Sequence, residues 1–444
     1  MLTLNNYLKK KILILGIGIT GLSCIHFFCM RNIPIRIMDF SIFPKNINKL
    51  PKFVPCHTGS VNYKWILESE LIIVSPGCSL NHPSLILAKK KGIEIIGDIE
   101  LFCREAKAPI IAITGSNGKS TVSTIIKKMI EKSGKKVQLG GNIGVPALLL
   151  LNKVTDFYIL ELSSFQLETI FNLHAKIAVI LNISEDHMDR YPFGINDYVK
   201  SKLNIYTNAK TCVWNAEDKL TTPTSVQEKE KITFGIHNGD YHLLKEGKEI
   251  WLSCQSKKIF NTKNMILSGT HNYINALASL LISDKIGLPR ENSLQFLECF
   301  SGLPHCFQLI HEKKGIKWID DSKATNVNST LAALKTLQEQ NISGIIWLLL
   351  GGDGKNSDFS PLKYYLKNMN IRAYCYGKDK FNLYKIYSKK SILVNSLKES
   401  LILITKKMKS GDIILLSPAC SSLDQFSSFK ERGNLFKKLS KELG

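Results

Sequence analysis

Residues 109–126, PIIAITGSNGKSTVSTII, constrain the fold of this chain more than any other stretch. The mostly apolar run 110–114 predicts a buried parallel strand, and the residues from Lys119 to about Lys132 predict a helix. The turn between them has two residues between Gly115 and Gly118, where the standard triphosphate loop has four. A strand, a glycine turn and a helix N-terminus in this order form an anion site, because unpaired N–H groups and the positive end of the helix dipole point to one spot.

We interpret this stretch as a nucleoside triphosphate site rather than as a glycine turn that merely precedes a helix. Lys119 would supply a positive charge for the β- and γ-phosphates, and the Ser120 hydroxyl would face Mg²⁺. The residues expected to bind the nucleoside triphosphate here are Gly115, Ser116, Asn117, Gly118, Lys119, Ser120 and Thr121.

The charge balance is unusual for an otherwise ordinary globular composition. The 444 residues carry a formal net charge of +22, although hydrophobic content is 44% and charged content 22%. Such a charge favours polyanionic partners, among them nucleic acid, anionic membrane surfaces and phosphorylated substrates. Because the lysines are spread through the chain among many Ile and Asn residues, we expect a solvated Lys-rich surface and no nucleic-acid partner.

The cysteines and the apolar runs predict a cytoplasmic protein. There are eleven cysteines, an odd number, with no C-x-x-C pair and no ligand spacing for zinc. The basic residues 9–11 and the apolar run after them resemble a signal peptide. However, Gly16, Gly18 and Gly21 interrupt that run, and no small-residue cleavage site follows. No stretch of about 18 uninterrupted apolar residues exists, so we expect no membrane insertion.

The N-terminal region predicts a compact α/β unit that ends near Gly97. A strand over residues 11–15 enters the G-x-G-x-x-G turn 16–21, a helix runs to about Met30, and a second strand, 35–38, ends at Asp39. This is a dinucleotide-binding pattern with an acid about 20 residues on. Such turns also hold other diphosphates, so a dehydrogenase is one of several interpretations.

In the second unit, two further strands end in polar clusters. Strand 157–160 leads to Glu161, and strand 176–182 leads to a cluster that contains His187. Ligands of parallel sheets bind beyond the carboxyl ends of the strands, so both residues are candidate Mg²⁺ ligands. Either one alone could equally cap a helix or lie on the surface. Further on, Asn272 and Asn275 could contact an adenine edge or cap the helix that follows them.

After Gly302 the α/β pattern restarts, with strands expected at 316–319, 344–350, 371–376 and 412–416. We therefore predict an α/β chain of three domains. They are a Rossmann-like domain over residues 1–97, a central ATPase-type sheet over 98–302, and a second Rossmann-like domain over 303–444.

Eight short segments, taken together and in order, resemble the Mur ligase family over essentially the whole chain. They are TGSNGKST, GGNIG, ELSSFQLE, EDHMDRYP, SGTHNYINA, DDSKATN, GGDGK and SPACSSLDQF. The resemblance implies an N-terminal domain for a UDP-sugar, a central ATPase and a C-terminal domain that brings an amino acid. The later segments imply the branch that adds D-glutamate to UDP-N-acetylmuramoyl-L-alanine through an acyl phosphate, in peptidoglycan precursor synthesis. ATP as co-substrate, two Mg²⁺ ions and a monomeric enzyme belong to the same expectation.

The resemblance also implies roles for individual residues. Lys119, Asn142, His187 and Lys202 would take part in catalysis, and Lys202 matches a lysine that the family carbamylates. Metal would be held by Ser120, Glu161, His187 and the carbamylated Lys202. Asn272, Asn275 and Asp321 would contact adenine and ribose. The UDP-substrate would contact Ile19, Thr20, Gly21, Asp39 and Gly77, and D-glutamate would contact Lys323, Thr325, Lys355, Ser422 and Phe429.

Two positions depart from the pattern of the family. Where relatives have Thr-Arg after the acid that matches Asp39, this chain has Phe40-Ser41, which puts one uridine-nucleotide contact in doubt. Where relatives read His-Arg, this chain has His305-Cys306, so an arginine expected near the ATP phosphates is missing.

Three other functions compete with this interpretation. A dehydrogenase would explain the first glycine turn and Asp39 but would leave the second phosphate loop without a role. A nucleic-acid-dependent ATPase would explain the net charge, yet the sequence contains no recognition helix, aromatic stacking motif or zinc module. A sibling ligase that adds another amino acid, or adds glutamates to folate, differs only in the later segments.

Overall fold

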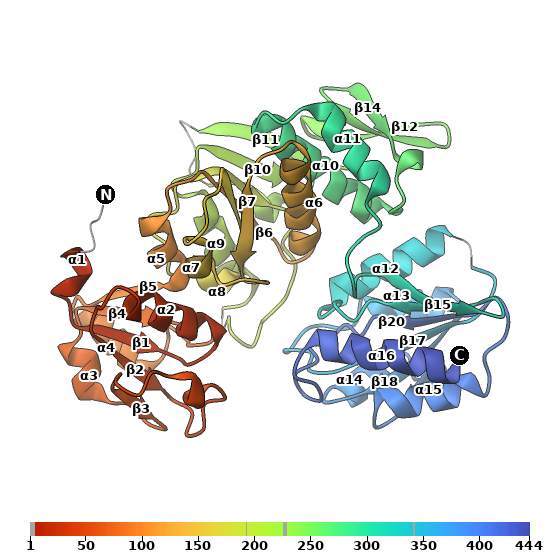
Figure 1. Ribbon diagram of the computed structural model, residues 1–444. Coiled ribbons are helices and arrows are strands. Elements are labelled where there is room, and N and C mark those ends of the chain that lie inside the picture. Colours follow the sequence, from red (N-terminus) through yellow and green to blue (C-terminus); the bar gives the residue numbers. More distant parts are fainter. Residues whose placement is uncertain (1–4, 192, 225–228, 341) are drawn as a thin grey trace. The chain divides into compact units, whose positions relative to one another are not determined.

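The computed structural model describes residues 5–191, 193–224, 229–340 and 342–444 (Figure 1). It divides into two compact units. The first comprises Met1–Ile183, Asn196–Met265 and Ile274–Cys299, and the second comprises Ser184–Ile195, Ile266–Tyr273 and Phe300–Gly444. The first unit contains two of the three sheets, and the second unit contains the third.

The first sheet is fully parallel, with strand order β3-β2-β1-β4-β5. Its strands are β1 (Ile12–Leu15), β2 (Ile35–Asp39), β3 (Cys56–Thr58), β4 (Leu71–Val74) and β5 (Glu94–Gly97). The helices of this region are α1 (Asn5–Leu8), α2 (Ile19–Cys29), α3 (Tyr63–Glu68), α4 (Pro83–Lys90) and α5 (Asp98–Glu105). The central strands β1 and β4 are buried along their whole length, as expected for apolar strands covered on both faces.

The second sheet has the order β14-β13-β12-β11-β10-β9-β6-β8-β7. Its strands are β6 (Ile110–Thr114), β7 (Val137–Gly141), β8 (Phe157–Glu161), β9 (Ala175–Ile180), β10 (Thr211–Asn215), β11 (Glu230–Gly235), β12 (Tyr241–Glu246), β13 (Glu249–Cys254) and β14 (Lys257–Asn261). Its helices are α6 (Lys119–Lys132), α7 (Ala147–Leu150), α8 (Ser164–Leu167), α9 (Ile195–Leu203), α10 (Thr270–Lys285) and α11 (Arg290–Cys299). Because β6 lies between β8 and β9 and all three run parallel, the residues that follow these strands meet at one edge of the sheet.

The third sheet has the order β15-β16-β20-β17-β18-β19, parallel except for the edge strand β15. Its strands are β15 (Gln308–Lys313), β16 (Ile316–Asp320), β17 (Ile346–Gly351), β18 (Ile371–Tyr376), β19 (Ser391–Leu393) and β20 (Ile413–Leu416). Its helices are α12 (Val327–Glu339), α13 (Leu362–Asn368), α14 (Lys380–Ile386), α15 (Leu397–Thr405) and α16 (Phe429–Leu443). Alternate residues of β17 face two apolar clusters, with Leu348 and Leu350 in one and Trp347 and Leu349 in the other.

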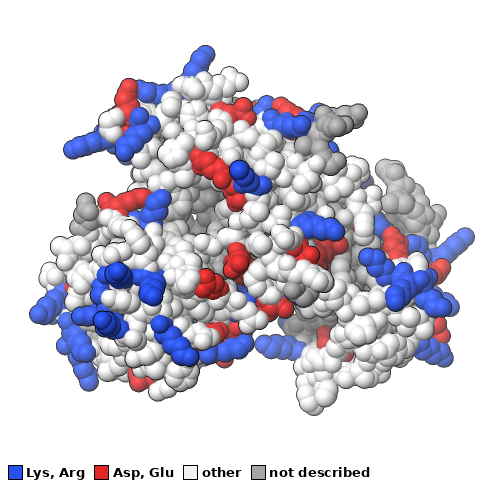
Figure 2. Space-filling model, turned by 180° about the vertical axis from the view of Figure 1, so that it is seen from behind, with Lys and Arg blue, Asp and Glu red and all other residues white. Residues whose placement is uncertain are grey.

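The prediction of an α/β chain built on largely parallel sheets is confirmed, and most of the expected strands lie within two residues of their observed bounds. None of the eleven cysteines, all of which lie in the described residues, forms a disulfide. Within the described ranges, no helix is both long enough and apolar enough to cross a membrane. On the face drawn in Figure 2, Lys and Arg side chains are scattered, with Asp and Glu side chains between them.

Candidate active site

The triphosphate loop has the expected strand–turn–helix geometry. β6 ends at Thr114, α6 begins at Lys119, and Gly115 and Gly118 between them have φ angles of +155° and +84°. These backbone conformations favour glycine. The Lys119 Nζ donates hydrogen bonds to the carbonyl oxygens of Gly115 (2.6 Å) and Ser116 (3.0 Å), so its charge lies directly over the loop. A phosphate in this loop would offer stronger acceptors to the same ammonium group.

Asn182, which follows β9, fixes the middle of this loop. Its Oδ1 accepts from the backbone N–H of Asn117 (2.8 Å), and its Nδ2 donates to the Asn117 carbonyl oxygen (3.1 Å). Its own carbonyl oxygen accepts from the backbone N–H of Ser116 (2.9 Å). The local sequence marks this residue only by its place at the end of a predicted strand, which gives it no particular function.

Lys202, on α9, is 1% exposed and lies against the same loop. Its Nζ donates to the Thr114 hydroxyl (3.2 Å) and to the Gly115 carbonyl oxygen (3.1 Å), and it lies 4.6 Å from the centre of the Tyr198 ring. Lys202 is therefore not the surface lysine that its local sequence would suggest. A lysine buried beside a phosphate loop is placed to act there.

Glu161 and Ser120 form an oxygen pair at the start of α6. The Ser120 hydroxyl donates to Glu161 Oε2 (2.7 Å). The other carboxylate oxygen, Oε1, is buried and has no hydrogen-bond partner among the described residues. A buried carboxylate oxygen without a partner is costly unless something else satisfies it, and carboxylate and hydroxyl oxygens are the ligands that Mg²⁺ takes. The residues present therefore fit a Mg²⁺ ion at this position.

His187 lies in the second unit, on the segment Ser184–Ile195. Its φ is +59°, and its Nε2 lies 3.7 Å from Asp186 Oδ1. Asp186 also accepts from Lys355 Nζ (2.7 Å) and from Asn326 Nδ2 (3.4 Å), both within the same unit. Lys355, expected to bind a substrate carboxylate, is thus paired here with a protein carboxylate.

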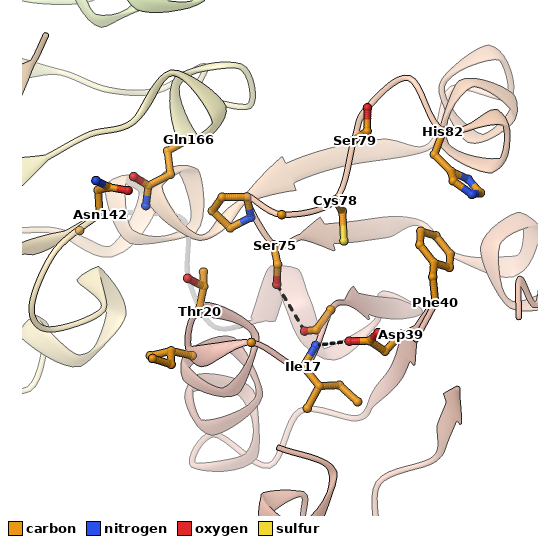
Figure 3. Close-up of a pocket in the computed structure, with 16 residues that line it drawn as sticks. Ile17, Thr20, Asp39, Phe40, Ser75, Cys78, Ser79, His82, Asn142 and Gln166 are labelled. Carbon is orange, nitrogen blue, oxygen red and sulfur yellow. Dashed lines mark hydrogen bonds between the residues drawn. The ribbon is translucent and has the colours of Figure 1, made fainter. Parts of the chain in front are cut away.

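A cavity of about 550 Å³ opens beside the first glycine turn (Figure 3). Four of the five residues predicted for the UDP-substrate line it, together with the predicted catalytic Asn142; the four are Ile19, Thr20, Asp39 and Gly77. Asp39 Oδ2 accepts from the backbone N–H of Ile17 (2.7 Å), which holds the acid against the turn. Gly21 is not a lining residue. A Cβ there would overlap the Gly16 carbonyl oxygen, so this glycine permits close helix–strand packing instead.

Phe40, the departure after Asp39, also lines this cavity. Its ring stacks on His82, with the ring centres 4.4 Å apart and the planes inclined by 15°. Figure 3 shows this pair at one end of the cavity and Asn142 and Gln166 at the other. His82 and Gln166 were not expected from the sequence, since neither belongs to the glycine turn or its acid.

All five residues predicted for D-glutamate lie in the second unit. Lys323 and Thr325 follow β16, Lys355 follows β17, Ser422 follows β20, and Phe429 begins α16. The order β16-β20-β17 makes these strands neighbours, so the loops after them share one edge of the sheet. The Lys323 Nζ lies 5.9 Å from the centre of the Phe429 ring.

Asp321 joins three segments at this edge. Its Oδ2 accepts from the Ser417 hydroxyl (2.7 Å), its Oδ1 from the backbone N–H of Phe307 (3.0 Å), and its own N–H donates to the Leu416 carbonyl oxygen (2.8 Å). Burial raises the pKa of this carboxyl to about 7. Of the two asparagines predicted for the nucleotide, Asn272 lies in the same unit as Asp321, and Asn275 lies in the other.

Comparison with known proteins gives matches along nearly the whole chain. Residues 10–97 match the family model described as "Mur ligase MurD-like, N-terminal domain", residues 113–283 match "Mur ligase middle domain", and residues 305–420 match "Mur ligase, glutamate ligase domain". The chain belongs to the Mur ligase family. The family resemblance noted in the sequence is therefore confirmed.

Curated members of this family are similar over their full length. The UDP-N-acetylmuramoylalanine–D-glutamate ligase of Escherichia coli (strain K12) is 52% identical over 439 residues, which cover 99% of this chain and 100% of that protein. The ligase of the same name from Buchnera aphidicola subsp. Schizaphis graminum is 54% identical over 99% of both chains.

Solved structures of more distant Mur ligases share the fold. UDP-N-acetylmuramate-alanine ligase MurC of Thermotoga maritima aligns with a TM-score of 0.63 at 19% identity, over 98% of this chain and 99% of that one. A pseudomurein peptide ligase type C from Methanothermus fervidus aligns with a TM-score of 0.61 at 17% identity, over 97% of this chain and 100% of that one. At these identities the similarity establishes the three-domain fold of the Mur ligases for this chain, and nothing about its substrate.

Proposed function

We propose that this chain is an ATP-dependent ligase that joins D-glutamate to UDP-N-acetylmuramoyl-L-alanine. The observation that carries the proposal is the 52% identity to a curated ligase of that name, which extends over 99% of this chain. The triphosphate loop and its lysine supply a site for the ATP that such a reaction requires. We also propose that the reaction takes place in the cytoplasm.

Chemistry explains why ATP is needed. A carboxylate is a poor electrophile, so the γ-phosphoryl group of ATP is first transferred to the alanyl carboxylate, which gives an acyl phosphate and ADP. The D-glutamate amine then attacks the acyl carbon, the amine loses a proton, and inorganic phosphate leaves from the tetrahedral intermediate. The charge of Lys119 over the loop would stabilise the anionic oxygens of the transferred group.

The residues that fit metal would assist the same step. Ser120 and Glu161 would hold a Mg²⁺ ion, with His187 and a carbamylated Lys202 as the candidates for further ligands and for a second ion. When bound, Mg²⁺ neutralises part of the negative charge of the triphosphate. The domain limits after residues 97 and 302, and a monomeric enzyme, remain predictions of the same proposal.

The remaining residues divide between the two other substrates. Ile19, Thr20, Asp39 and Gly77 line a cavity of about 550 Å³, large enough for a substrate fragment of drug size. We assign it to the UDP-substrate, with Phe40 and His82 at one end. Lys323 and Lys355 would bind the two carboxylates of D-glutamate, with hydroxyl groups from Thr325 and Ser422.

ADP release, measured with a coupled assay, tests the proposed function. We expect turnover only when UDP-N-acetylmuramoyl-L-alanine and D-glutamate are both present. Equal turnover with L-lysine or diaminopimelate would assign the chain to a sibling ligase. Oxidation of a nicotinamide cofactor, or ADP release that depends on added nucleic acid, would instead support one of the two other classes.

Lys202 gives a second test, aimed at the carbamate. An ammonium group beside Mg²⁺ would repel the metal, whereas a carbamate supplies hard oxygen ligands. We expect Lys202→Ala to lose most activity and short carboxylic acids such as acetate to restore part of it. Lys200→Ala, on the exposed side of the same helix, is the matched control. Near-normal activity of Lys202→Ala would exclude the carbamate.

A further inference from the structure

Arg432 is a fully buried cation that the proposed chemistry leaves without a role. It lies on α16, three residues after Phe429, and is 0% exposed. A guanidinium group buried in protein is strongly unfavourable unless hydrogen bonds compensate it. The hydrogen bonds of this side chain therefore indicate its role.

The guanidinium donates to three carbonyl oxygens from three separate segments. Nη1 donates to Gly351 (3.2 Å), and Nη2 donates to Ser322 (2.9 Å) and to Cys420 (3.0 Å). These residues are 81, 110 and 12 positions away in the sequence. One planar group thus joins the last residue of β17 to the segments that follow β16 and β20.

Each of these segments carries a residue assigned above to D-glutamate. Ser322 directly precedes Lys323, Gly351 ends the strand four residues before Lys355, and Cys420 lies two residues before Ser422. Thr325 follows Lys323 in the same loop, and Phe429, the fifth such residue, lies one turn before Arg432 on α16. The three carbonyl contacts therefore connect every element of the glutamate site.

The start of α16 is itself fixed, so the guanidinium has a rigid base. The Ser428 hydroxyl caps the helix by accepting from the backbone N–H of Glu431 (3.3 Å). The next residue after the arginine, Gly433, packs so closely that a Cβ there would lie 2.8 Å from Asp320 Oδ2. Because α16 packs this closely against the sheet, its position constrains the loops whose carbonyl groups Arg432 contacts.

We propose that Arg432 is a positioning residue that sets the relative placement of the three loops that bind D-glutamate. It touches no substrate. Its rigid fork of donors fits three fixed carbonyls, which the single ammonium group of a lysine cannot match. Loss of the fork lets the loops shift independently, so the affinity for the amino acid falls most. The cavity assigned to the UDP-substrate contains none of these loops and keeps its form.

Two substitutions of Arg432 test this inference, which rests on the proposed function. With Arg432→Met we expect the KM for D-glutamate to rise about 10- to 100-fold, since a misplacement of about 1 Å is enough for such losses. The KM for UDP-N-acetylmuramoyl-L-alanine should stay within about twofold. The KM for ATP should rise less than the KM for D-glutamate, because in these loops only Asp321, next to Ser322, is expected to contact the nucleotide. Arg432→Lys should lie between Arg432→Met and the wild type, because the three donors of an ammonium group share one nitrogen and cannot reach all three carbonyl groups as the planar fork does. This second variant retains a buried cation, so it provides the test if Arg432→Met does not fold.

Leu401→Ala is the matched control for loss of stability. Leu401 is fully buried in α15, in the apolar cluster on the side of the sheet that α16 also covers, and it carries no polar contact to the loops. A cavity there lowers stability, and we expect no change in the KM for D-glutamate. An unchanged KM for D-glutamate in both Arg432 variants, or an equal rise of all three KM values, would overturn the inference. Absence of D-glutamate-dependent ADP release in the wild type would instead overturn the proposed function.

Discussion

At the scale of single residues, Cys306 is one of two positions at which the sequence departs from the pattern of the family. It lies between His305 and Phe307, whose φ angles of +67° and +47° place both in the left-handed region. Its backbone N–H donates to the Leu303 carbonyl oxygen (3.3 Å). A thiol is a weak hydrogen-bond donor without the permanent positive charge of a guanidinium group, so it cannot replace an arginine.

Cys306→Arg restores the arginine that the family resemblance implies near the ATP phosphates. Loss of one contact that stabilises developing charge typically costs about 10²- to 10³-fold in rate. We expect the variant to raise kcat or to lower the KM for ATP, with no change in the KM for D-glutamate. Cys299→Arg, at an exposed cysteine at the end of α11, controls for the added charge. Identical ATP parameters in wild type and Cys306→Arg would mean that another cation already fills the role, or that position 306 does not face the phosphates.

At the scale of elements, the triphosphate loop depends on glycine for two separate reasons. Gly118 has a φ of +84°, which side chains rarely adopt, and a Cβ there would lie 2.6 Å from Asn275 Oδ1. Gly134, just beyond α6, has a similar φ of +78°, but a Cβ there would meet nothing within 4 Å. A comparison of substitutions at the two positions therefore distinguishes the effect of backbone strain from that of steric contact at the site.

Gly118→Ala should impair ATP binding, and Gly134→Ala should not. Both substitutions carry the strain of a left-handed residue, on the order of 1 kcal/mol of stability. In Gly118→Ala the new methyl group also displaces Asn275 or the loop, so we expect the KM for ATP to rise about tenfold or more. Steady-state kinetics and thermal melting of both variants check this. Equal KM values for ATP would show that strain alone matters.

At the scale of the whole molecule, stability should depend on pH through buried acids. Asp98, at the start of α5, is 1% exposed, and its Oδ1 has no hydrogen-bond partner among the described residues. Burial raises the pKa of this carboxyl to about 6. An unfolded aspartate has a pKa of about 3.9, so between these values the folded chain binds more protons than the unfolded chain. The free energy of unfolding therefore falls as the pH rises through this range.

Asp98→Asn removes this titration while it preserves the shape of the side chain. We expect the free energy of unfolding of Asp98→Asn, relative to that of the wild type, to rise by about 3 kcal/mol from about pH 4 to about pH 7. Urea unfolding at several pH values measures this difference. Asp358→Asn should shift in the opposite sense with pH, because hydrogen bonds from Ser360 hold the pKa of that exposed carboxyl below its ordinary value. A stability difference between Asp98→Asn and wild type that is independent of pH would contradict the expectation.

The amino-acid sequence by itself determined the local elements of this protein. Apolar runs, glycine turns and helix starts act over a few neighbouring residues, so strands such as β6 and the loop before α6 could be predicted without any partner. The order of the polar segments is also given directly by the sequence, which is why the family can be recognised from it. The candidate residues Lys119, Ser120 and Glu161 came from these local patterns.

Only the tertiary structure decided which distant segments meet. Lys202 reaches Thr114 across 88 positions, Asn182 holds a loop 65 positions away, and Arg432 joins three segments up to 110 positions away. No local pattern distinguishes Lys202 and Arg432 from surface lysines and arginines, and the place of Asn182 at the end of a predicted strand does not show which loop it holds. Their partners follow from the order in which the strands pair in the sheets, and that order is set by long-range packing of the whole chain.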